Sequence, residues 1–147
     1  MLLELSVAGA EFMVVGAHAL AAHGVPRATG DIDIWVRPTD RNAERVLEAL
    51  ATFGAPLFDL SKEDLTKTDT VFQMGIPPGR IDILTGISGV NFNDAWERRL
   101  TLVLPGMDVP IAVISKMDFV TNKRATGRAK DLLDVQMLAE ADQASKE

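Results

Sequence analysis

Two aspartates stand two residues apart in the segment Asp31–Val36, which reads Asp-Ile-Asp-Ile-Trp-Val. Side chains of a β-strand alternate between its two faces, so Asp31 and Asp33 are predicted to share one face while the isoleucines take the other. Their Cα atoms would lie roughly 6.5–7 Å apart, close enough for both carboxylates to bind one or two divalent cations. Aspartate is depleted in strands, which favours metal binding; the alternative is an ordinary solvated strand face.

A third aspartate, Asp82, occupies the middle of the apolar segment Arg80–Leu84. A carboxylate between apolar strand residues is unusual unless something pairs with it. Beside Asp31 and Asp33, Asp82 would complete a cluster of three carboxylates, and such a cluster repels itself strongly unless a cation is bound. The alternative is a surface ion pair between Arg80 and Asp82.

The segment before the first two aspartates predicts a strand, a tight turn and a short helix. An apolar strand is expected over Glu11–Val15, and Gly16 can adopt the backbone angles that lead directly into a helix over Ala17–His23. Gly24 ends this helix and Pro26 prevents its continuation. The free amides at a helix N-terminus are a binding site for phosphate, so the pattern predicts phosphate and metal chemistry close together.

These residues resemble the signature of the DNA polymerase β-like nucleotidyltransferase superfamily. That signature is an apolar residue, Gly and then Gly or Ser, followed after a short gap by two acids separated by one apolar residue, with a third acid on a later strand. The segment Val14–Val36 is most similar to a branch of small bacterial proteins related to the abortive-infection toxin nucleotidyltransferases. The segment Asn122–Leu138 is similar to the basic helix pair of that branch. Ala17 departs from the signature, because it keeps the amide but lacks the serine hydroxyl.

The resemblance implies a Mg²⁺-dependent nucleotidyltransferase, with Mn²⁺ as the other candidate metal. Asp31, Asp33 and Asp82 would hold the metal and a nucleoside triphosphate, and a nucleoside monophosphate would move to a hydroxyl of an RNA, a protein or a small molecule. Asp82 would assist deprotonation of that hydroxyl. The amides of Gly16, Ala17 and the residues that follow would hold the phosphates.

A basic cluster lies near the C-terminus, although the net charge of the chain is −6: Lys116, Lys123, Arg124, Arg128 and Lys130. The resemblance implies that Lys123 and Lys130 reach the phosphates of the nucleotide and that Asp131 and Asp134 lie near the site. The alternative for Lys130 is a surface pair with Asp134, four residues further along the same helix.

Four further polar residues lie near the glycine turn. Arg27 and Thr29 are in the loop before the acidic strand, where they are candidates for binding phosphate or base or are simply solvated. His18 and His23 are predicted to be packing or helix-surface residues rather than metal ligands, since Asp82 already supplies a third ligand.

The length indicates one domain, residues 1–147. The expected helices and strands, together with the resemblance, imply the α/β class in its α+β form. We expect a short mixed or antiparallel sheet flanked by helices, with the acids at one edge of the sheet. Further helices are expected at 2–8, 40–53, 92–99, 115–125 and 128–141, and strands at 71–76, 80–84, 100–104 and 109–113. The helix pair 115–143 closes the domain, and its last helix is predicted to bury Leu132, Leu133, Val135, Met137 and Leu138.

The composition bears on where in the cell the protein is expected. The absence of cysteine excludes disulfides and thiolate metal sites and is compatible with a reducing cytoplasm. No apolar run approaches the ~20 residues of a membrane span, and the first residues do not read as a secretory signal. We therefore expect a cytoplasmic protein with no membrane partner, and a homodimer or a partner protein could complete a site in so short a chain.

Three other functions stay open on the sequence. The domain could be an antitoxin-like partner in a toxin–antitoxin or phage-defence setting, in which case a cognate protein would co-purify with it. It could be a degenerate domain that binds nucleotide without chemistry, which Ala17 favours. It could also be a metal-dependent phosphodiesterase, which would cleave nucleic acid without added triphosphate.

Overall fold

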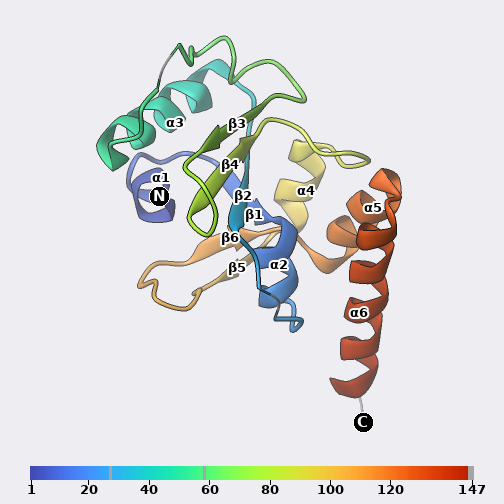
Figure 1. The fold of residues 1–147 in the computed structure, drawn as a ribbon. Coiled ribbons are helices and arrows are strands. Elements are labelled where there is room, and N and C mark those ends of the chain that lie inside the picture. The colour runs from blue at the N-terminus through green and yellow to red at the C-terminus, as the bar shows by residue number, and fades with distance from the viewer. Residues whose placement is uncertain (27, 58, 146–147) are drawn as a thin grey trace.

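A mixed sheet of six strands carries the fold in the computed structural model, which describes residues 1–26, 28–57 and 59–145. The strand order is β3-β4-β2-β1-β6-β5 (Figure 1). The strands are β1 Phe12–Val15, β2 Asp31–Val36, β3 Val71–Met74, β4 Arg80–Leu84, β5 Leu100–Leu102 and β6 Ile111–Val113. The helices are α1 Leu2–Val7, α2 Gly16–Ala22, α3 Asp40–Phe53, α4 Phe92–Arg98, α5 Lys116–Thr126 and α6 Ala129–Ser145.

The pairing of β2 with its two neighbours fixes the positions of the acids. Strand β2 runs antiparallel to β1 and parallel to β4. In this register Asp33 lies between Val15 on β1 and Asp82 on β4, and Asp31 lies beside Arg80. The parallel pairing therefore brings together acids that are far apart in the sequence.

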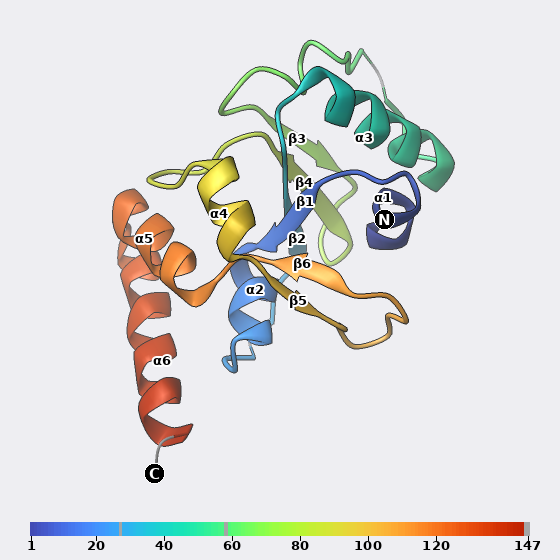
Figure 2. The same cartoon turned by 180° about the vertical axis from the view of Figure 1, so that it is seen from behind.

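Helices lie on both faces of the sheet. Figures 1 and 2 show α1 and α3 on one side of the sheet and α4, α5 and α6 on the other. Side chains cap α3 and α5: the Thr39 hydroxyl accepts a hydrogen bond from the amide of Asn42, and the Ser115 hydroxyl accepts one from the amide of Asp118. Gly127 ends α5 in the left-handed conformation. The predicted mixed sheet flanked by helices is thus confirmed.

Within the described part of the chain, no helix combines the length and the apolar content that crossing a membrane requires.

The predicted buried stripe of the last helix is wrong at two of its five residues, Leu132 and Leu133. Leu132 and Leu133 are 48% and 52% exposed, whereas Asp131 and Asp134 of the same helix are almost completely buried. Leu138 alone of the five predicted residues is fully buried. The helix lies at the border of the domain, where α5 covers one side of it (Figure 1). Lys123 on α5 and Arg128, just before α6, pair with its aspartates, so burial of the carboxylates is compensated and the leucines face outward.

This arrangement predicts unequal costs for two leucine substitutions in one helix. Leu138→Ala should lower the free energy of unfolding by about 2–5 kcal/mol, because it leaves a cavity in the core. Leu132→Ala should change it by no more than about 0.5 kcal/mol. Urea unfolding followed by circular dichroism measures both. Equal losses would restore the apolar stripe predicted from the sequence.

Candidate functional site

Three carboxylates converge on the face of the sheet that looks toward α5 and α6. Asp31, Asp33 and Asp82 each offer one oxygen, and these oxygens all lie within 4.8 Å of one another. Asp82 is only 6% exposed, and the other two are partly buried. Hard oxygen donors at this spacing match the ligand chemistry of Mg²⁺.

Gly16 packs directly against this cluster. It leaves β1 with a φ of +69° and opens α2. A Cβ atom at this position would lie 2.2 Å from Asp33 Oδ2, closer than any van der Waals contact permits. The glycine is required both for the left-handed backbone and for the space that the carboxylate of Asp33 occupies.

Arg80 lies between two of the three acids. Its guanidinium is 3.1 Å from Asp31 Oδ2 and 3.1 Å from Asp82 Oδ1. The Arg80–Asp82 ion pair, which the sequence offered as an alternative to the acidic cluster, therefore exists together with the cluster. Burial opposes ionisation of Asp31, but hydrogen bonds from the Thr29 hydroxyl and from Arg80 hold the pKa of its carboxyl below the ordinary value.

Asp33 has a raised pKa in this cluster. Burial, together with the charges of Asp31 and Asp82, raises the pKa of the Asp33 carboxyl to about 7. No cation among the described residues forms an ion pair with it, whereas both of its acidic neighbours contact Arg80. A bound cation would favour the ionised form of Asp33.

A polar cavity of about 470 Å³ opens above the three acids. The acids form one wall, and the opposite wall comes from the α5–α6 junction, which contributes the cations Lys123, Arg128 and Lys130. A cavity with carboxylates on one side and cations on the other is complementary to a polyphosphate that carries divalent metal.

The buried aspartates of α6 hold two of these cations, Lys123 and Arg128, in place. Lys123 Nζ lies 3.4 Å from Asp131 and 3.7 Å from Asp134, and Arg128 lies 2.7 Å from Asp131. Thr126 also donates a hydrogen bond to Asp131. Burial opposes ionisation, but these donors hold the pKa of the Asp131 carboxyl well below its ordinary value. Asp131 is therefore a fixed anion that orients Lys123 toward the cavity.

The sequence matches, over residues 3–145, a protein family described as "Nucleotidyltransferase of unknown function (DUF6036)". The chain belongs to this nucleotidyltransferase family. A search of curated proteins returned no match. The resemblance to nucleotidyltransferases is thereby confirmed, while the relation to the abortive-infection branch, the toxin–antitoxin setting and the cytoplasmic location stay predictions.

Most of the nucleotidyltransferase site residues that the sequence predicts line this one cavity. They are Gly16, Ala17, Thr29, Asp31, Asp33, Asp82, Lys123 and Lys130. Arg27 lies outside the described residues. Lys130 forms none of the ion pairs found among the described residues, and its predicted alternative partner, Asp134, instead contacts Lys123.

Two of the cations that line the cavity, Arg80 and Arg128, were not predicted as site residues. Arg80 stands two residues before Asp82 on one strand, so alternation alone places both side chains on the same face. Arg128 belongs to the basic cluster, of which Lys116 pairs with Asp142 and does not line the cavity. His23 is buried with Nε2 2.7 Å from the carbonyl of Ile114, which agrees with its predicted packing role.

Replacing Gly16 tests the close approach to Asp33. Gly16→Ala should lower the free energy of unfolding by about 1–2 kcal/mol, because alanine is strained in the left-handed conformation. The added Cβ should also displace Asp33 and thereby abolish Mg²⁺-dependent nucleotide binding. Gly106→Ala is the matched control, because Gly106 also has a positive φ but a Cβ added there would meet open space. Thermal unfolding and calorimetric titration with MgATP measure the two effects. Retained binding in Gly16→Ala would show that the contact is not required.

The raised pKa of Asp33 predicts a pH-dependent effect of Asp33→Asn. Without metal, the native protein holds this proton more tightly than the unfolded chain between about pH 4 and pH 7, so its stabilising contribution is lost as the pH rises through that window. Asparagine cannot ionise. The variant should therefore match the parent near pH 4 and be more stable near pH 8, by on the order of 1 kcal/mol because solvent screens a half-buried group.

Urea unfolding in EDTA at the two pH values makes this measurement. Asp108→Asn, in the exposed β5–β6 turn, controls for the general change in charge. A loss of stability in Asp33→Asn that is the same at both pH values would contradict the electrostatic explanation.

Proposed function

We propose that the protein is a metal-dependent nucleotidyltransferase that moves a nucleoside monophosphate from a nucleoside triphosphate to a hydroxyl acceptor. The observation that carries the proposal is the convergence of Asp31, Asp33 and Asp82, whose oxygens lie within 4.8 Å of one another. Membership of a nucleotidyltransferase family supports it independently of the geometry.

The donor set fits a divalent metal of the Mg²⁺ or Mn²⁺ type. All three ligands are carboxylate oxygens, and Asp82 is too buried for water to screen its charge effectively. When bound, the metal would supply activation of the acceptor hydroxyl and neutralisation of the leaving pyrophosphate. We propose that the three aspartates bind this metal.

The other cavity residues have separate roles in this proposal. Lys123 and Lys130 would bind phosphate oxygens from the side opposite the acids, with Arg128 beside them. Gly16 and Ala17 border the cavity and would offer backbone amides. Asp82, which Arg80 holds in position, would receive the proton of the acceptor hydroxyl.

Thr29 acts on Asp31 in this proposal rather than on the substrate. Its hydroxyl lies 3.0 Å from the backbone carbonyl oxygen and 3.1 Å from Oδ1 of Asp31, and it donates its single proton to these acceptors of Asp31. A hydroxyl proton engaged in this way is not available to a phosphate oxygen, so Thr29 orients a metal ligand.

A domain that binds nucleotide without chemistry is the second candidate. Ala17, which lacks the hydroxyl often found at this position of the family signature, is the residue that favours it. The two candidates differ in turnover: only the enzyme releases pyrophosphate from a bound triphosphate when a hydroxyl acceptor is present.

Calorimetric titration with each of the four ribonucleoside triphosphates, with and without Mg²⁺, tests the proposal. We expect Mg²⁺-dependent binding of at least one triphosphate, weakened at least about tenfold, equivalent to about 1.4 kcal/mol, in Asp33→Asn. Asp108→Asn should bind as the parent does. Binding that is equally tight in Asp33→Asn would exclude the three aspartates as the metal site.

Turnover is measured by incubating the protein with triphosphates labelled at the α-phosphate and with RNA, protein or small hydroxyl acceptors. Label on an acceptor, with release of pyrophosphate, supports transfer. Cleavage of RNA in the absence of any triphosphate would instead indicate a phosphodiesterase, and binding without transfer would indicate the degenerate domain.

A further inference from the structure

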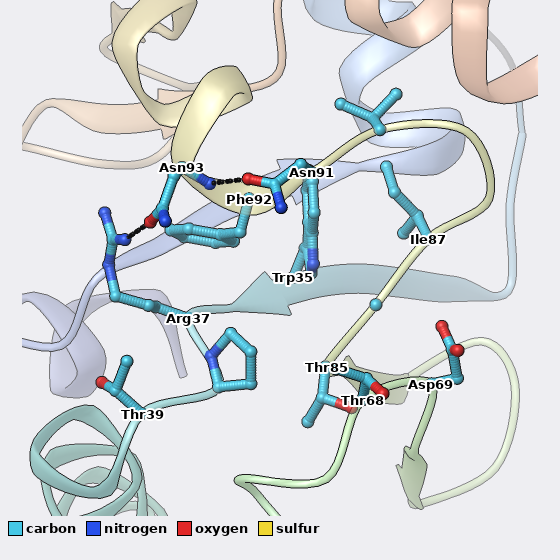
Figure 3. A pocket seen from close by; sticks show the side chains of 13 residues that line it. Trp35, Arg37, Thr39, Thr68, Asp69, Thr85, Ile87, Asn91, Phe92 and Asn93 are labelled. Carbon is cyan, nitrogen blue, oxygen red and sulfur yellow. Dashed lines mark hydrogen bonds between the residues drawn. The ribbon is translucent and has the colours of Figure 1, made fainter.

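A second hollow of about 410 Å³ lies further along the same face of the sheet (Figure 3). Alternation along β2 places Trp35 on the same face as Asp31 and Asp33. The indole of Trp35 and the ring of Phe92, which meet edge to face at 5.0 Å, form one wall of this hollow. Asp69, Thr68 and Thr85 lie across from them in Figure 3.

The hollow is continuous with the acidic cavity. A third depression of about 280 Å³ shares Gly16, Asp33, Lys123 and Arg128 with the cavity above the acids. The same depression shares Asp69, Gly86 and Ile87 with the hollow beside Trp35. The three depressions therefore adjoin one another along a surface groove that runs from the three acids to Trp35.

Two buried hydrogen-bond donors in this hollow have no partner among the described residues. They are Nε1 of Trp35, whose side chain is only 1% exposed, and Nε of Arg37. An unpaired buried donor is costly, and native proteins avoid it unless a ligand or water satisfies the group. The two donors therefore point to a ligand that presents hydrogen-bond acceptors at this wall.

Asp69 supplies a hydrogen-bond acceptor to the hollow, in contrast to these two donors. It has a φ of +61°, and it is the only residue other than glycine with a positive φ in the described ranges. Gly86 makes room for it, because a Cβ there would lie 2.5 Å from Asp69 Oδ1. Strained backbone of this kind concentrates at functional sites, and here it places an exposed carboxylate, which accepts hydrogen bonds, at the junction of two depressions.

We propose that this hollow binds a nucleobase. The edge of a base carries acceptors, which suit the donors of Trp35 and Arg37, and donors, which suit the carboxylate of Asp69. Trp35 follows Asp33 by two residues, roughly 6.5–7 Å along the strand, so a nucleotide whose phosphates meet the acids can reach it. The position of the phosphates rests on the proposed function, whereas the binding of the base does not.

The base can come from two sources. It is either the base of the nucleoside triphosphate itself or the base of a terminal nucleotide that serves as the acceptor. Both present the same chemistry to the hollow, and occupancy experiments separate them.

Fluorescence of Trp35 reports on the hollow directly. The chain contains two tryptophans, and Trp96→Phe leaves Trp35 as the only one while keeping a ring stacked on Phe92. We expect saturable quenching by at least one of adenosine, guanosine, cytidine and uridine in EDTA, since nucleosides carry no phosphate and need no metal. Calorimetry of the parent protein with the same nucleosides checks that the substitution has not created the effect.

A charge-neutral replacement of Asp69 tests the assignment of the base edge. Asp69→Asn should weaken binding of the preferred nucleoside about tenfold, and asparagine tolerates the same positive φ. Asp108→Asn is the matched control and should bind as the parent does. Equal binding by Asp69→Asn and the parent would overturn the placement of the base against Asp69.

Adding a magnesium triphosphate separates the sources of the base. If the hollow holds the base of the triphosphate, the triphosphate will quench Trp35 and displace the nucleoside. If it holds the base of the acceptor, the triphosphate and the nucleoside, or a short RNA oligonucleotide, will bind together.

The failure of this proposal is distinguishable from failure of the proposed function. Mg²⁺-dependent triphosphate binding with no quenching by any nucleoside, triphosphate or oligonucleotide would exclude the nucleobase site and leave the metal site intact. Nucleoside quenching without any Mg²⁺-dependent triphosphate binding would exclude the metal site and leave the nucleobase site intact.

Discussion

Mutual repulsion among three carboxylates is the constraint on which the rest of the site depends. Asp31, Asp33 and Asp82 are held within 4.8 Å of one another by the pairing of β2 with β4. Arg80 offsets the charges of two of them, and Asp33 responds by retaining its proton up to a pKa of about 7. The sheet thus maintains a cluster of acids that is unfavourable in itself, and a divalent cation is the natural species to relieve it.

The opposite wall of the cavity brings positive charges together and holds them in place. Lys123 and Arg128 are positioned by carboxylates buried in α6, chiefly Asp131. A helix that used its apolar residues against the domain would have left these lysine and arginine side chains without fixed partners. The outward direction of Leu132 and the burial of Asp131 are therefore two consequences of one arrangement.

Strand β2 connects the two halves of the groove. The alternation of its side chains places Asp31, Asp33 and Trp35 in a line on one face. The two charged residues therefore lie at one end of the groove and the aromatic residue at the other. Gly16 and Gly86 each lie where an added Cβ would strike an aspartate oxygen. These two close contacts make space for carboxylates at the acidic cavity and at the hollow beside Trp35.

The sequence by itself determined the strand that carries Asp31 and Asp33, the glycine turn before it and the caps of the later helices, because these features depend on local backbone geometry and on alternation along one strand. Only the tertiary structure decided that Arg80 contacts two acids at once, that α6 buries Asp131 and exposes Leu132, and that Asp69 approaches the groove. Those outcomes depend on which distant segments meet. An aspartate next to fixed cations can be buried where helical periodicity alone would place a leucine.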